Sequence, residues 1–219
     1  MLFRSTPYPV QLTGRLVLTF APVADVFSDD PSILFATGGR SVTFVVPANA
    51  TRAVFGLNSA TVGLQTGTVA GTITLTALFA TDPGGINLTV NTAPATNIAV
   101  RPSAPRIRSV QISARTATGF TVLITGYAPT RSVNQMAFQF RPFVDPNNAD
   151  LKLDTTSLNL SVDGPFSAWY QSTASQAFGS LFTATVTFTV RGDIDAIQSL
   201  AVTLSNALGA SNSVSANLR

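Results

Sequence analysis

Two neighbouring aromatic residues, Trp169 and Tyr170, are the side chains in this sequence that best suit ligand binding. They lie in residues 167–172, a stretch without the two-residue alternation of a strand, which we expect to form a loop or a short helical turn. An exposed aromatic pair can stack on a sugar ring or anchor a partner protein. The alternative is that Trp169, together with Phe166 and Phe178, closes one open end of a hydrophobic core.

Oxygen-bearing side chains gather in residues 145–150, where Asp145, Asn147 and Asp150 follow one another closely. Carboxylate and amide oxygens in loops are the ligands that calcium takes. The spacing departs from the helix-loop-helix calcium pattern, because Ala149 stands where an oxygen ligand is expected and the glycine of that pattern is missing. Two interpretations follow, a calcium site and a solvated turn, and the sequence indicates no other cofactor.

Groups for acid, base or nucleophilic catalysis are scarce. The chain has no histidine and no cysteine, and all ten acidic residues are aspartates, so a Ser-His-Asp triad, a thiol nucleophile and a histidine zinc site are excluded. The aspartates that could pair locally are Asp29 with Asp30, Asp145 with Asp150, and Asp193 with Asp195. Each pair lies in turn-like sequence, where aspartate commonly caps the backbone. We therefore predict that the chain is not an enzyme.

Charge and hydropathy restrict the partners. The formal net charge is +3 and only 11% of the residues are charged, which leaves too few positive groups for a groove that follows nucleic acid phosphates. The sequence contains no apolar run of the roughly 18 residues that a membrane helix needs. We expect neither nucleic acid binding nor membrane insertion.

The elements that must position these residues are strands, because apolar residues alternate with threonine and other polar residues through most of the chain. Leu16, Leu18 and Phe20 alternate with Arg15 and Thr19 in this way. We expect strands in the first half near residues 12–20, 33–35, 42–46, 52–55, 73–79, 86–90 and 98–100. Turn sequences separate them, among them residues 82–85 (Asp-Pro-Gly-Gly).

Two prolines, Pro102 and Pro105, interrupt this pattern and predict a short, stiff linker at residues 102–105. Beyond it we expect strands at residues 107–112, 120–124, 136–140, 158–162, 182–190, 200–204 and 214–218. Seven short strands in each half are typical of an antiparallel β-sandwich. The sequence thus predicts an all-β protein with one sandwich domain at residues 1–101 and a second at residues 106–219; a single large sandwich is the alternative.

Five stretches of the second half carry a family resemblance: residues 126–131, 166–172, 178–180, 188–193 and 197–204. They resemble the tandem immunoglobulin-like repeats of large bacterial cell-surface and secreted proteins. The resemblance implies two tandem immunoglobulin-like sandwich domains and an extracellular location. The chain differs from antibody domains in lacking the cysteine pair, and Trp169 lies outside any clear strand.

We expect from these observations a non-catalytic structural or adhesive module of a surface protein, cut from a longer exported chain. Its partners would be other copies of itself or neighbouring domains of the same protein. Uncharged edge strands favour self-assembly into a filament or array, with residues 1–12 as the segment added to a neighbour. The alternative is a carbohydrate-binding module that uses Trp169 and Tyr170.

Overall fold

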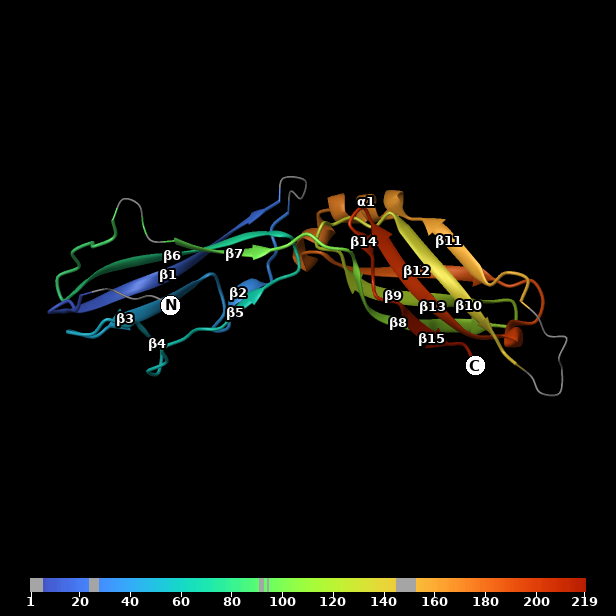
Figure 1. Cartoon of the computed structure of the whole chain (residues 1–219), viewed down its shortest axis with the longest axis horizontal. Helices are drawn as coiled ribbons and strands as arrows, with labels where there is room; N and C mark the ends of the chain where they lie inside the picture. The colour runs from blue at the N-terminus through green and yellow to red at the C-terminus, as the bar shows by residue number, and fades with distance from the viewer. Residues whose placement is uncertain (1–5, 24–27, 91–92, 94, 145–152) are drawn as a thin grey trace. The chain divides into compact units, whose positions relative to one another are not determined.

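The structure is a computed structural model that describes residues 6–23, 28–90, 93, 95–144 and 153–219. Antiparallel strands dominate it, which confirms the prediction of an all-β protein. The chain forms two compact units, and Figure 1 labels their strands. Unit 1 comprises residues 1–67 and 71–100, and unit 2 comprises residues 68–70 and 101–219. Residues 68–70 thus belong with the second half, although they precede the two prolines in sequence.

Unit 1 consists of a five-stranded sheet in the order β4-β3-β1-β6-β7 and a two-stranded sheet of β2 and β5. Its strands are β1 (Gln11–Pro22), β2 (Ile33–Phe35), β3 (Ser41–Val46), β4 (Val54–Phe55), β5 (Leu64–Thr66), β6 (Gly71–Asp82) and β7 (Ala95–Val100). The alternation in β1 determines its faces, since Leu12, Leu16 and Leu18 are buried. Gly14 lies in the same row, where an added Cβ would come within 2.3 Å of the Phe44 ring. The glycine therefore lets this ring lie flat on β1.

One predicted strand of unit 1, residues 86–90, is absent and is replaced by side-chain hydrogen bonds. Only Asn87 forms an isolated bridge, with Ala80. The Asn87 side chain accepts the Thr89 amide at 2.9 Å, and the Thr89 hydroxyl accepts the Phe79 amide at 3.1 Å. These side chains bond to backbone groups that would otherwise pair with the backbone of a neighbouring strand. Residues 86–90 therefore run beside β6 without forming a strand.

Unit 2 has the arrangement of a β-sandwich, with two sheets that enclose one core. One sheet has the order β12-β9-β8; the other has the order β11-β10-β13-β14, with β15 also paired to β13. The strands are β8 (Arg106–Thr116), β9 (Gly119–Tyr127), β10 (Gln135–Pro142), β11 (Ser157–Ser161), β12 (Leu181–Thr189), β13 (Ile197–Asn206), β14 (Gly209–Ala210) and β15 (Val214–Asn217). In Figure 1, β10 and β13 run across β8, β9 and β12. The inward rows of both sheets form this core, and Val122, Phe138 and Val202 among them are fully buried.

Helical segments lie within unit 2, in the connections that lead to β12 and to β13. They are α1 (Asp163–Gln171) and two short 3-10 turns, η1 (Ala174–Phe178) and η2 (Ile194–Ala196), the last of which precedes β13. Helix α1 buries Phe166 and Tyr170 against the core of the sandwich. The stretch that we expected to be a loop or short helical turn is therefore part of a helix, because residues 166 and 170, four apart, face the same apolar surface.

Candidate functional site

A cleft in unit 2 brings together aromatic, hydroxyl and cationic side chains. It has a volume of about 500 Å³ and is lined by Arg108, Thr125, Gly126, Trp169, Phe178, Leu181, Phe182 and Thr183. These residues come from α1, η1 and the sheet of β8, β9 and β12. The cleft is therefore built where the helical segment meets one end of the three-stranded sheet.

Trp169 forms one wall of the cleft and is held in place by a hydrogen bond. Its indole Nε1 donates to the Leu181 carbonyl at 3.2 Å, while part of the ring packs on the core. The Phe178 ring lies 6.0 Å from it, with an angle of 38° between the planes, and half of the Phe178 side chain (52%) is exposed. Trp169 and Phe178 thus offer a partly exposed, pre-oriented aromatic pair.

Tyr170 points away from this pair. Its side chain is only 7% exposed, and its hydroxyl donates to the Ser180 carbonyl at 2.8 Å. Burial raises the pKa of Tyr170 above its ordinary value of 10.0, and the nearby Arg131 guanidinium, 4.9 Å from the ring centre, opposes that shift. Trp169 and Tyr170 therefore do not form one platform, and Phe178 takes the place that the sequence suggested for Tyr170.

Arg108 reaches the cleft through an irregularity of β8. The register of β8 and β9 shifts between Ile107 and Ser109, which face Gly126 and Thr125, and Arg108 is the extra residue between them. A β-bulge of this kind redirects a side chain, and bulges are frequent beside functional sites. Arg108 is exposed and forms no ion pair with any residue that the structure describes. Sequence reasoning missed Arg108 because nothing in the pattern of β8 marks the bulge.

Two of the three aspartate pairs that the sequence suggested for chemistry lie in the described residues, and both are engaged in turns. Asp29 accepts the Asp30 amide at 2.8 Å and pairs with Arg40, while Asp30 is fully buried and accepts the Ser32 hydroxyl. Asp193 accepts the Asp195 amide at 2.8 Å, and Asp195 pairs with Arg115. These bonds stabilise backbone turns.

The predicted calcium ligands Asp145, Asn147 and Asp150 lie outside the described residues. Within the described part of the chain, no group of three or more acidic side chains could hold a metal ion. No helix among the described residues is long and apolar enough to cross a bilayer.

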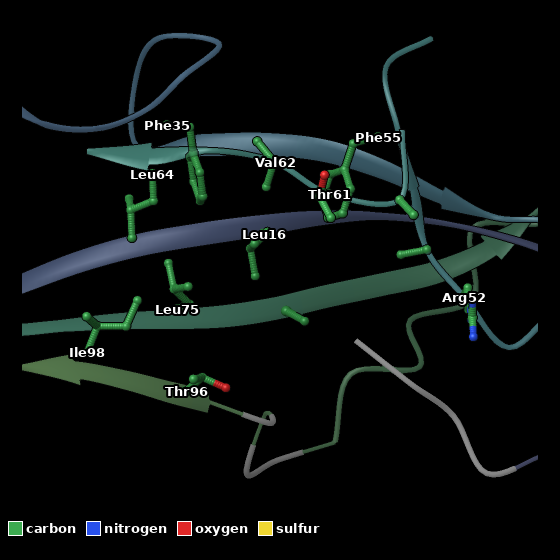
Figure 2. Close-up of a pocket in the computed structure, with 13 residues that line it drawn as sticks. Leu16, Phe35, Arg52, Phe55, Thr61, Val62, Leu64, Leu75, Thr96 and Ile98 are labelled. Atoms are coloured by element: carbon green, nitrogen blue, oxygen red, sulfur yellow. The ribbon is translucent and has the colours of Figure 1, made fainter. Parts of the chain in front are cut away.

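Unit 1 contains a second concavity, an apolar groove of about 530 Å³. Figure 2 shows Leu16, Leu75 and Ile98 on one side of it, with Phe35, Val62 and Leu64 on the other. The larger sheet contributes Leu16, Leu75 and Ile98 to its lining, while β2 and β5 contribute Phe35 and Leu64. Its lining includes no acidic side chain and only Arg52 as a cationic one, so it brings together no groups for proton transfer.

The edge of β12 is the other feature with a functional implication. Among the described residues β12 pairs with β9 alone, in an unbroken register from Leu181 to Thr189, and it carries no charged residue and no proline. Its outward row consists of Thr183, Thr185, Thr187 and Thr189, all exposed. This edge of the sandwich is therefore regular and uncharged.

Comparisons with known proteins leave these sites to be judged on their geometry. No protein-family model matches the chain, and no curated protein matches its sequence significantly.

Proposed function

We propose that this chain is a non-catalytic structural or adhesive module of a bacterial surface protein, built from two immunoglobulin-like sandwich domains in tandem. Two compact all-β units with separate cores support the tandem arrangement. The lack of histidine and cysteine, and the use of the described local aspartate pairs in turns, support a non-catalytic role. The resemblance of the second half to bacterial surface repeats supports the extracellular location.

The observation that carries the proposal is the unprotected edge of β12. Proteins usually guard an edge strand with charge, proline or a bulge, because its free backbone groups can pair with another chain. The opposite edge of the same sheet, β8, has two register shifts and carries Arg106, Arg108 and Arg115. β12 has none of these devices over nine residues, although the Leu181 carbonyl at its start accepts the Trp169 indole. A second copy is the partner that such an edge suits best.

Pairing of β12 with β12 would join two copies around a twofold axis, which gives a dimer. A filament needs a second contact of another kind. β7 of unit 1 is a candidate, since among the described residues it pairs with β6 alone and is also uncharged. Alternating β12 and β7 contacts would produce a linear array without any further component.

The pairing is testable by disulfide trapping, because the chain has no cysteine of its own. Thr185 stands at the middle of β12, so two antiparallel copies would bring Thr185→Cys of each chain together and cross-link under mild oxidation. Gln111→Cys is a matched control. Gln111 on β8 and Thr185 on β12 both pair with Leu123 of the central strand β9, from opposite sides. Equal dimer yields from the two variants would contradict pairing through β12.

Carbohydrate binding is the second candidate function, and the Trp169–Phe178 cleft is the observation that favours it. The cleft matches a ring-sized ligand in combining stacking surfaces with the Thr125 and Thr183 hydroxyls. Screening the full chain against a panel of soluble glycans tests it. Binding should be weakened in Phe178→Ala, and the absence of any bound glycan would reject this function.

A further inference from the structure

The cleft in unit 2 carries one positive charge and no negative one. Among the described residues, Arg108 is the only charged one that lines it. Two other arginines of unit 2 are engaged: Arg115 pairs with Asp195, and Arg131 binds the Tyr170 and Gly179 carbonyls. Arg108 makes no such contact among the described residues, so its guanidinium is free to bind a ligand.

The neighbouring groups define what that ligand would be. Trp169 and Phe178 present faces on which a pyranose ring can stack. The Thr125 hydroxyl, 2.7 Å from the Ser109 hydroxyl, and the exposed Thr183 hydroxyl can bond to ring hydroxyl groups. A guanidinium binds a carboxylate or a sulfate through two parallel hydrogen bonds. A sugar that bears a negative charge can use all three features: the aromatic faces, the threonine hydroxyls and the guanidinium.

We infer that this cleft binds an anionic saccharide, with one ring against Trp169 and Phe178 and the acidic group on Arg108. The inference rests on the carbohydrate-binding candidate above and adds the charge of the ligand to it. The register shift of β8 falls at Arg108, and bulges are frequent beside functional sites. A peptide carboxylate could reach Arg108 too, but the hydroxyl lining favours a sugar.

Calorimetric titration of the full chain with oligosaccharides of equal length tests this inference. The probes are oligogalacturonate, a sulfated carrageenan oligomer, and uncharged cello- and malto-oligosaccharides; an acidic peptide is included for comparison. We expect at least one anionic sugar to bind more tightly than the uncharged ones. Whether the carboxylated or the sulfated probe binds identifies the acidic group.

Matched variants separate the contributions to binding. Arg108→Gln should weaken binding of the anionic sugar by about tenfold or more, because a charge-assisted bond is lost. Arg141→Gln removes the same charge from an exposed site on β10, outside the cleft, and should leave the affinity unchanged. Phe178→Ala removes an exposed stacking surface while the Trp169–Leu181 hydrogen bond remains, and should weaken binding of every sugar.

The outcomes distinguish the two claims. If uncharged sugars bind as tightly as anionic ones and depend on Phe178, the carbohydrate function holds and the anionic preference is overturned. Equal losses in Arg108→Gln and Arg141→Gln would also overturn it, since the effect would then reflect total charge. If no sugar binds, or only the acidic peptide does, both the inference and the carbohydrate function are rejected.

Discussion

Arg131 anchors the helical segment to the end of unit 2. Its guanidinium donates to the carbonyls of Gly179 and Tyr170 and, at 2.8 Å, to the hydroxyl of Ser175, which is fully buried. Removing a charged donor from buried acceptors leaves them unsatisfied. Arg131 therefore stabilises the position of α1 and η1, and with it the cleft.

Arg131→Ala should lower the free energy of unfolding of unit 2 by about 2–3 kcal/mol. Urea unfolding followed by tryptophan fluorescence measures this, because Trp169 is the only tryptophan and lies in unit 2. Arg141→Ala, at an exposed position, should change stability by less than about 0.5 kcal/mol. Similar effects of the two substitutions would show that the Arg131 contacts do not stabilise the fold.

Tyr170 should make unit 2 sensitive to alkali. Because burial raises the pKa of Tyr170 above 10.0, the unfolded chain loses this proton at a lower pH than the folded chain does. The stabilisation is complete below about pH 10 and is lost as the pH rises further. Unfolding by urea at pH 8 and at pH 11 should show a larger loss of stability in the wild type than in Tyr170→Phe. Equal losses would contradict burial of a protonated hydroxyl.

The candidate site could be predicted only in part from the residues. Trp169 was identified from its side-chain chemistry, and it does line a cleft. Tyr170 was paired with it incorrectly, since successive residues of a helix point in directions about 100° apart, and Tyr170 is buried while Trp169 is only partly so. Arg108 was not identified because a bulge depends on strand register, which a single strand sequence does not encode.

At the scale of elements, β12 contributes both the open edge and the centre of the aromatic core. The Phe188 ring lies 4.9 Å from Phe120 and 4.9 Å from Phe138, and 5.6 Å from Phe140. These contacts link the two sheets of the sandwich, since Phe120 and Phe188 lie in one sheet and the other two in the second. The inward row of β12 therefore fixes the strand while its outer edge stays open.

Phe188→Ala should destabilise unit 2 by about 3 kcal/mol, since it removes a ring from the contact between the sheets. Thr189→Ala, at the exposed neighbouring position, should cost much less. Tryptophan-detected urea unfolding compares the two. If Phe188→Ala were as stable as Thr189→Ala, β12 could not be an integral strand of the core.

Strand prediction succeeded where alternation alone determines the structure and failed where side chains intervene. β1, β3, β6, β9, β10, β12 and β13 each carry a long alternating row, and each lies where it was expected. Residues 86–90 alternate as well, but Asn87 and Thr89 bond the backbone instead. β5 was missed because Leu64 is its only apolar residue, whereas β2, equally short, is entirely apolar. Residues 11 and 12, expected in a segment donated to a neighbour, lie inside β1, where Leu12 is buried and pairs with Val46 and Thr81.

At the scale of the whole molecule, each unit has a core of its own. Phe44→Ala should destabilise unit 1 by about 3 kcal/mol, because Phe44 is buried and packs edge-on against Phe55 at 5.9 Å. The Trp169 fluorescence transition, which reports unit 2, should not move, while far-ultraviolet circular dichroism should show an earlier transition. A shift of the fluorescence midpoint would contradict two separately folded domains.

Self-association through β12 is the central claim, and sedimentation velocity of the full chain over a wide concentration range tests it most directly. We expect the sedimentation coefficient to rise with concentration in the wild type and in Gln111→Lys. In the double variant Thr185→Lys and Thr187→Lys it should rise no further than the value of a dimer joined through β7, since lysines on an edge strand oppose pairing through β12. A wild-type chain that sediments as a monomer at every concentration would contradict the proposed assembly.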